Sequence, residues 1–155
     1  MSILKTGDEA PFFRAENQYT KEISLEMFKG KKIILYFYPK DMTLGCTAEA
    51  CNLRDNYSFL QDKNFVIIGI SADSVKSHQK FSEAHTLPFH LIADTDKNII
   101  KSYGAWGLKK FMGRQYEGIL RKTFIIDENG VIIKIMDKVD TKNHTEQILN
   151  ELNIK

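Results

Sequence analysis

Two cysteines, Cys46 and Cys51, are the residues of this sequence whose type and spacing most directly suggest chemistry. Cys46 opens a segment in which apolar residues recur every three or four positions, as on one face of an amphipathic helix: Ala50, Leu53, Tyr57 and Leu60. The first turn of a helix has free backbone N–H groups and the positive end of the helix dipole, and both favour a thiolate over a thiol. The sequence therefore predicts a reactive sulfur at Cys46.

The second cysteine is predicted to lie on a different side of the same helix. Cys51 is about 140° around the helix from Cys46, on a more polar face, so its thiol is expected to be partly exposed. Five residues of helix separate the two Cα atoms by roughly 8.5 Å, whereas a disulfide needs less than about 7 Å. A bond between these sulfurs would therefore require the first turns of the helix to unwind.

Strands and helices are predicted to alternate along the chain. Residues 33–38 form a continuous apolar run that Pro39 closes, which is typical of a strand buried on both faces. Other strands are predicted at residues 65–71, 89–93, 123–126 and 131–136, and other helices after residue 73, after residue 94 and over residues 143–152. Residues 105–119 show no periodicity and are predicted to form a loop.

This alternation predicts an α/β fold, in which helices cover both faces of a mixed sheet that ends in a β-hairpin. Residues 12–30, before the first central strand, are predicted to be irregular, with short extended pieces and a helical turn at residues 25–28. A chain of 155 residues is long enough for one hydrophobic core, so a single domain over residues 1–155 is expected.

Composition excludes several classes of function. The net charge of +2 comes from 22 basic and 20 acidic side chains spread along the chain, so no nucleic-acid surface is expected. The first residues lack the pattern of a signal peptide, and no apolar run approaches the ~18 residues of a membrane span. We therefore expect a cytoplasmic protein without a membrane partner. In that reducing compartment, a disulfide between two cysteines is more often catalytic than structural.

No cofactor or metal site is expected. Gly113 and Gly118 have the spacing of a P-loop but are not followed by its Lys-Ser/Thr pair. The cysteines have no histidine near them in sequence, and His78 and His85, seven residues apart on one predicted helix face, lack a third ligand. We expect these two histidines to be interfacial or surface residues.

The residues around Cys46 resemble a known family. Residues 39–46 match the P-x-x-x-T-x-x-C active-site signature of peroxiredoxins, which are thiol peroxidases on a thioredoxin-like fold. A second cysteine five positions later resembles the bacterioferritin comigratory protein, or peroxiredoxin Q, subgroup. The resemblance spans nearly the whole chain, because it extends to residues 7–12, 103–107 and 111–113 and to Arg121, which resembles the active-site arginine.

The resemblance implies a thioredoxin-like mixed sheet with an N-terminal extension, and an enzyme that reduces hydrogen peroxide and organic hydroperoxides. Cys46 would attack the peroxide and become a sulfenic acid. Thr43 would bind the peroxide, Arg121 would favour the thiolate and hold the oxygens, and Pro39 would shield the site from water. Cys51 would form a disulfide with Cys46, as in atypical 2-Cys enzymes. A dithiol such as thioredoxin would then reduce the disulfide, and the protein would be a monomer or a weak dimer.

The residues alone leave other interpretations open. Arg121 could equally be a surface cation, and Glu49 could either pair with Arg121 or contact the helix dipole favourably. A general thiol–disulfide oxidoreductase is a second hypothesis, although its usual mark is C-x-x-C and the spacing here is C-x₄-C. A third is a binding or chaperone module on the same fold, with the cysteines as packing residues.

Overall fold

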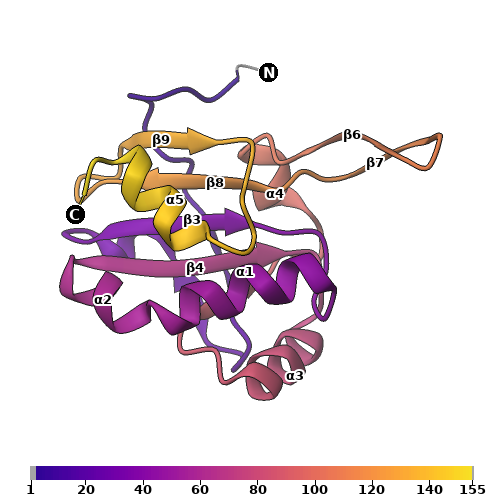
Figure 1. Cartoon of the computed structure of the whole chain (residues 1–155), viewed down its shortest axis with the longest axis horizontal. Coiled ribbons are helices and arrows are strands. Elements are labelled where there is room, and N and C mark those ends of the chain that lie inside the picture. The colour runs from indigo at the N-terminus through magenta and orange to yellow at the C-terminus, as the bar shows by residue number, and fades with distance from the viewer. Residues whose placement is uncertain (1–2, 155) are drawn as a thin grey trace.

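A five-stranded mixed sheet forms the centre of the computed structural model, which describes residues 3–154 (Figure 1). Its strand order is β5-β4-β3-β8-β9, where the strands are β3 (Lys32–Phe37), β4 (Phe65–Ser71), β5 (His90–Ala93), β8 (Lys122–Ile126) and β9 (Ile132–Met136). The pairs β3–β4 and β4–β5 are parallel, and the pairs β3–β8 and β8–β9 are antiparallel. The predicted mixed sheet and its closing hairpin are confirmed.

Helices cover both faces of the sheet. One face carries α1 (Leu44–Asp55), α2 (Tyr57–Asp62) and α5 (His144–Glu151), with α3 (Val75–His85) beside β5 at its edge. The other face carries α4 (Asn98–Ser102). The continuous helix predicted over residues 46–60 is instead two helices, because the backbone breaks at Asn56. Within residues 3–154, no helix is long and apolar enough to cross a membrane.

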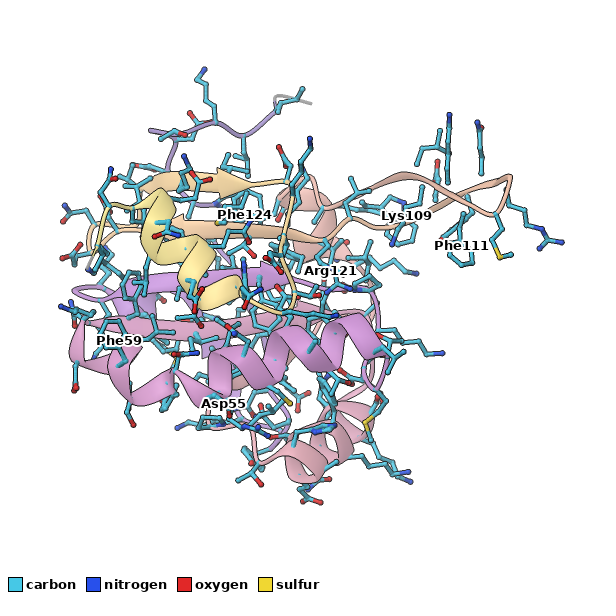
Figure 2. All side chains as sticks on the ribbon, in the orientation of Figure 1. Asp55, Phe59, Lys109, Phe111, Arg121 and Phe124 are labelled. Carbon is cyan, nitrogen blue, oxygen red and sulfur yellow. The ribbon has the colours of Figure 1, made fainter. Side chains whose placement is uncertain are left out.

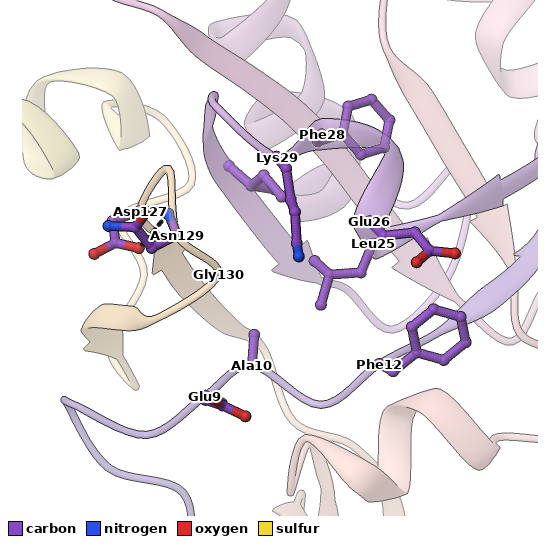
Figure 3. Close-up of a pocket in the computed structure, with 11 residues that line it drawn as sticks. Glu9, Ala10, Phe12, Leu25, Glu26, Phe28, Lys29, Asp127, Asn129 and Gly130 are labelled. Atoms are coloured by element: carbon purple, nitrogen blue, oxygen red, sulfur yellow. Dashed lines mark hydrogen bonds between the residues drawn. The ribbon is translucent and has the colours of Figure 1, made fainter.

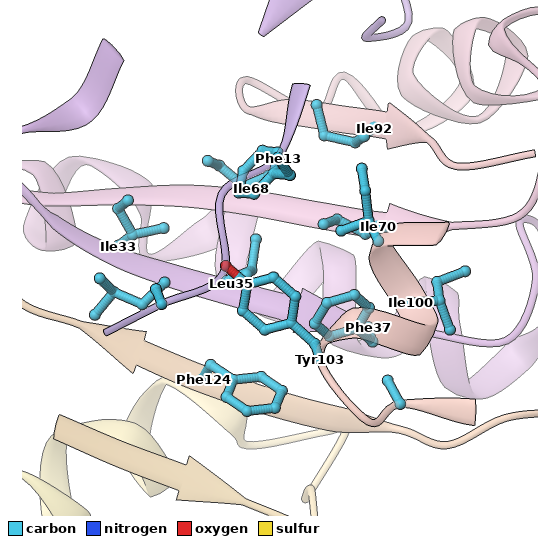
Figure 4. Packing of buried hydrophobic residues seen from close by; sticks show 14 of the residues in the cluster. Phe13, Ile33, Leu35, Phe37, Ile68, Ile70, Ile92, Ile100, Tyr103 and Phe124 are labelled. Carbon is cyan, nitrogen blue, oxygen red and sulfur yellow. The ribbon is translucent and has the colours of Figure 1, made fainter. Parts of the chain in front are cut away.

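The central strand β3 is buried on both faces, as its apolar run predicted. Its successive side chains point to opposite sides, so Leu35 and Phe37 join one core cluster whereas Ile34 and Tyr36 join the other. Figure 4 shows the first cluster, in which Phe37 and Tyr103 pack around the ring of Phe124. Because β3 is locked between two cores, the loop that follows it leaves the sheet from a rigid position.

The N-terminal extension packs against the sheet, and its residues Gly7 and Asp8 pair with the start of β9. The Gly7 N–H donates to the Ile132 carbonyl over 2.8 Å, and the Ile132 N–H donates to the Asp8 carbonyl over 2.9 Å. Two short strands and a 3₁₀ turn follow: β1 (Arg14–Glu16), β2 (Glu22–Ser24) and η1 (Leu25–Phe28). The short extended pieces and the helical turn predicted for residues 12–30 are confirmed.

The prediction of a loop over residues 105–119 is wrong. This segment is a two-stranded antiparallel arm, β6 (Trp106–Phe111) and β7 (Arg114–Ile119), that projects from the body of the molecule (Figure 1). The arm turns through Met112 and Gly113, whose φ angles of 51° and 80° suit a two-residue hairpin turn. Most of the arm is exposed on both sides, so it lacks the alternation of apolar and polar residues from which a strand is predicted.

One close approach inside the sheet gives a prediction about stability. A Cβ atom at Gly69 would lie 2.8 Å from the Tyr36 hydroxyl and 3.0 Å from a methyl group of Leu91. Since both neighbours are fully buried, Gly69→Ala should lower the free energy of unfolding by about 1–3 kcal/mol. Urea denaturation measures this change. The exposed control Gln79→Ala should change it by less than about 0.5 kcal/mol. Equal stability of Gly69→Ala and wild type would contradict the prediction.

Candidate active site

Cys46 lies in the first turn of α1 and is only 1% exposed, so the predicted position at a helix start is confirmed. Its helix begins immediately after Thr43, whose extended backbone ends the loop that starts at Pro39. The Thr43 hydroxyl does not cap the helix; it donates to the Lys40 carbonyl over 2.9 Å. With its hydrogen already engaged, the Thr43 oxygen keeps its lone pairs free for another donor.

The guanidinium of Arg121 joins two side chains of α1. Its Nη2 lies 3.2 Å from the sulfur of Cys46, and its Nη1 donates to a carboxylate oxygen of Glu49 over 2.7 Å. Figure 2 shows Arg121 between the start of β8 and α1. A Cβ at Gly45 would lie 3.3 Å from Nη2, so glycine leaves room for the cation there. Arg121 is therefore not a surface cation, and Glu49 pairs with it.

Glu49 is a fully buried carboxylate with only one of its oxygens hydrogen-bonded within the described chain. Burial raises the pKa of Glu49 to about 7, and the attraction of Arg121 offsets only part of that rise. The nearest other cation candidate is His144 on α5, whose Nε2 is 3.6 Å from the second Glu49 oxygen. Burial lowers the pKa of His144 to about 4, so the ring is neutral and Arg121 alone supplies positive charge to Glu49.

A pocket of about 400 Å³ opens at Arg121. Two of the predicted site residues, Pro39 and Arg121, line this pocket. The other lining residues are Lys109, Leu120, Lys122 and Asp137. Lys109 comes from the arm and donates to the Ile119 carbonyl over 2.9 Å. Burial, and then the charge of Arg121, lower the pKa of Lys109. Sequence reasoning missed this lysine because it did not predict the strand that carries it.

Cys51 is half-buried on a different side of α1, as predicted. Its Sγ lies 3.8 Å from Nδ1 of His85, at the end of α3. Both cysteines are free thiols within one unbroken helix, whose geometry separates their Cα atoms by roughly 8.5 Å. The structure therefore brings together Cys46 and Arg121, with Pro39 beside Arg121 in the pocket wall, and it leaves Cys51 apart from them. Thr43 ends the loop directly before the helix of Cys46.

A buried polar network anchors the loop before Cys46. The carboxylate of Asp41 accepts from the hydroxyls of Tyr38 and Ser77 over 2.6 and 2.8 Å and contacts Nδ1 of His78 over 2.8 Å. Asp73 accepts from the Asp41 N–H over 2.8 Å. The ligand atoms of Asp41, Asp73 and His78 lie within 4.8 Å of one another, but these hydrogen bonds already engage them. The network ties the loop to α3.

The network also shows which of the two expected placements each histidine takes. His78 is fully buried between α3, the loop of Asp41 and β5, so it is interfacial and not at the surface; its ring contacts the Asp41 carboxylate and the Ile92 carbonyl, which make burial of this polar side chain possible. His85 is half-buried where α3 meets α1, which confirms the interfacial placement. No sequence signal connects His85 with Cys51, because the contact depends on how α3 packs.

A second cavity, of about 250 Å³, lies at the opposite end of β3 beside Ile33. Figure 3 shows it between the N-terminal extension at Ala10, the 3₁₀ turn at Leu25 and the hairpin turn at Gly130. No cysteine, histidine or tyrosine lines it. The cavity therefore offers no nucleophile comparable to Cys46.

Comparison with known proteins gives matches along most of the chain. The model of the AhpC/TSA family matches residues 6–135. Peroxiredoxin Bcp from Bacillus subtilis is 43% identical over 96% of this chain and 95% of its own length. Peroxiredoxin Bcp from Escherichia coli is 41% identical over 98% of this chain and 97% of its own length. A solved structure of peroxiredoxin Q from Xanthomonas campestris has a TM-score of 0.85 at 30% identity, covering 91% of this chain and 90% of that one.

The environment of Glu49 predicts a dependence of stability on pH. Folding raises its pKa from 4.5 to about 7, so the native protein retains a proton that the unfolded chain loses. The resulting stabilisation is fully present below pH 4.5 and is lost as the pH rises through about 7, a change of about 3 kcal/mol.

Glu49→Gln removes this titration. Its free energy of unfolding, measured by urea denaturation at pH 5 and pH 8, should therefore fall less between the two values than that of wild type. The exposed control Glu83→Gln should retain the wild-type difference. If Glu49→Gln retained it as well, the carboxyl of Glu49 would not be the titrating group.

Proposed function

Because this chain belongs to the AhpC/TSA family and is a thiol-dependent peroxidase of the peroxiredoxin Q type, we propose that Cys46 is the thiol oxidised by peroxide and Cys51 the thiol that resolves it. The observation that carries this assignment is the Arg121 guanidinium, 3.2 Å from the buried sulfur of Cys46. A cation in contact with sulfur stabilises the thiolate, which is the nucleophilic form.

In the first step, peroxide enters the pocket beside Pro39 and Arg121. The Cys46 thiolate attacks one oxygen, the O–O bond breaks, and the other oxygen leaves as hydroxide or alkoxide. Arg121 is a donor already in place for the negative charge that develops on that oxygen. The Thr43 hydroxyl donates its hydrogen to the backbone carbonyl of Lys40. The hydroxyl oxygen therefore accepts a hydrogen bond from the peroxide O–H. Pro39, in the pocket wall, limits the access of water.

In the second step, the sulfenic acid of Cys46 condenses with the thiol of Cys51 and releases water. The two residues lie on different sides of a continuous α1, so the first turns of the helix must unwind before the sulfurs meet. An added oxygen atom on a sulfur that is only 1% exposed crowds its neighbours and favours that opening.

A dithiol reductant such as thioredoxin then restores both thiols by exchange. This step suits a reducing compartment such as the cytoplasm. We assign the cycle to a protein that is a monomer or a weak dimer. We assign the whole cycle to a single domain over residues 1–155. The two core clusters support this, because they lie on the two faces of one sheet.

Peroxide consumption coupled to a thioredoxin system tests the two cysteine roles. Wild type should turn over, and Cys46→Ser should be inactive because it lacks the attacking sulfur. Cys51→Ser should reduce one equivalent of peroxide and then stop, unless another thiol takes the place of Cys51. Full activity of Cys46→Ser would rule out the proposed function.

The role of Thr43 has its own test. Thr43→Val keeps the side-chain shape but removes the hydroxyl, so the second-order rate constant of Cys46 oxidation should fall about tenfold or more. Thr43→Ser, the matched control, should retain most of the rate. Trapping of the sulfenic acid in a Cys51→Ser background measures both rates. A wild-type rate in Thr43→Val would mean that the hydroxyl does not bind peroxide.

A further inference from the structure

We propose that His85 is a catalytic residue, the general base that removes the proton from Cys51 when the disulfide forms. This inference rests on the proposed roles of the two cysteines. It concerns the second step of the cycle, for which the residues around Cys46 provide no base. Arg121 contacts both Cys46 and Glu49, and Cys51 lies on another side of the helix.

The first support is the contact between the two side chains. Nδ1 of His85 is 3.8 Å from the sulfur of Cys51, and both residues are half-buried where α1 meets the end of α3. Within residues 3–154, no other side chain makes a hydrogen bond to this sulfur. A histidine ring nitrogen beside a cysteine sulfur is a common arrangement in which histidine activates a cysteine.

The second support is that the imidazole is held in place. The carbonyl of His85 accepts a hydrogen bond from Arg54 over 2.8 Å, and the ring meets the ring of Phe81 edge-on, with centroids 5.4 Å apart. The charge of Arg54 is offset by Asp55, 2.9 Å away. His85 also ends α3, where the helix dipole favours a positive charge on the ring. A proton taken from Cys51 is therefore accommodated there.

The third support is that α1 is anchored unequally along its length. Arg54 ties its C-terminal half to α3. Asn52 ties it to the start of α5, because its side chain donates to the Lys142 carbonyl over 3.0 Å and accepts from the Thr145 N–H over 2.8 Å. At the other end, Leu44 is 93% exposed, and no hydrogen bond of the described chain ties the side chains of Cys46 and Glu49 to a neighbouring helix, because both contact Arg121. Oxidation of Cys46 removes the thiolate that Arg121 contacts, so the first turns can unwind and carry Cys46 toward Cys51, while Cys51 stays beside its base.

The chemical step balances without another reactant. Nδ1 of His85 takes the proton of the Cys51 thiol, and the resulting thiolate attacks the sulfur of the Cys46 sulfenic acid. An S–S bond forms, the S–O bond breaks, and the hydroxide that leaves takes up a proton from the imidazolium, directly or through solvent. The products are the disulfide, one water and neutral His85.

Quench-flow measurement of each step in the full-length protein tests this role. After mixing with hydrogen peroxide, sulfenic acid and disulfide are quantified by alkylation and mass spectrometry. His85→Gln keeps a polar side chain but removes the base, so disulfide formation at pH 7 should slow about tenfold, and Cys46 oxidation should stay within about twofold of wild type. The deficit should shrink toward pH 9, where hydroxide in solution can replace the imidazole as the base.

Two further variants make the result decisive. His85→Asn, a smaller amide, should show the same selective loss, and His90→Gln, which changes a half-buried histidine bonded to Asn17, should behave as wild type. Disulfide formation that is unchanged or faster in the His85 variants would overturn the proposal, as would an equal slowing of both steps. Failure of wild type to form a sulfenic acid would instead overturn the proposed function.

Discussion

The bridge that Arg121 makes between Cys46 and Glu49 is the interaction on which the site depends. Two buried acidic groups on one helix face would be costly without a cation, and one guanidinium contacts both. The sheet puts that cation in place. In the antiparallel pair of β3 and β8, Phe37 lies opposite Lys122. Arg121, which directly precedes Lys122, is therefore level with the end of β3. The loop from that end leads directly to Cys46.

In the proposed cycle, the helix that carries both cysteines must meet two opposing demands. It has to be formed while Cys46 reacts, because its first turn and Arg121 define the surroundings of the sulfur. It has to open before Cys51 can reach the oxidised sulfur. The anchoring of Asn52 and Arg54 to neighbouring helices resolves this conflict, because it confines the opening to the first turns.

How far the sequence predicts this protein depends on the range of the interactions involved. The central strands and the position of Cys46 follow from local patterns, such as the apolar run ending at Pro39, and they were predicted correctly. The position of Arg121 came from family resemblance, since no local pattern distinguishes it from a surface cation. The structure also decided between the two roles considered for Glu49, because only packing brings residues 49 and 121 together. The strands of the arm and the pairing of Cys51 with His85 leave no periodic signal, and they were missed for that reason.

The most direct test of the account is the rate at which iodoacetamide alkylates Cys46 at pH 7 in Cys51→Ser protein, with and without Arg121. Arg121→Met keeps much of the length of the side chain and removes its charge. If the guanidinium stabilises the thiolate, this change should slow alkylation about tenfold or more. Lys122→Met, which removes a neighbouring cation paired with Asp137, should leave the rate nearly unchanged. Equal rates in the presence and absence of Arg121 would contradict the central claim.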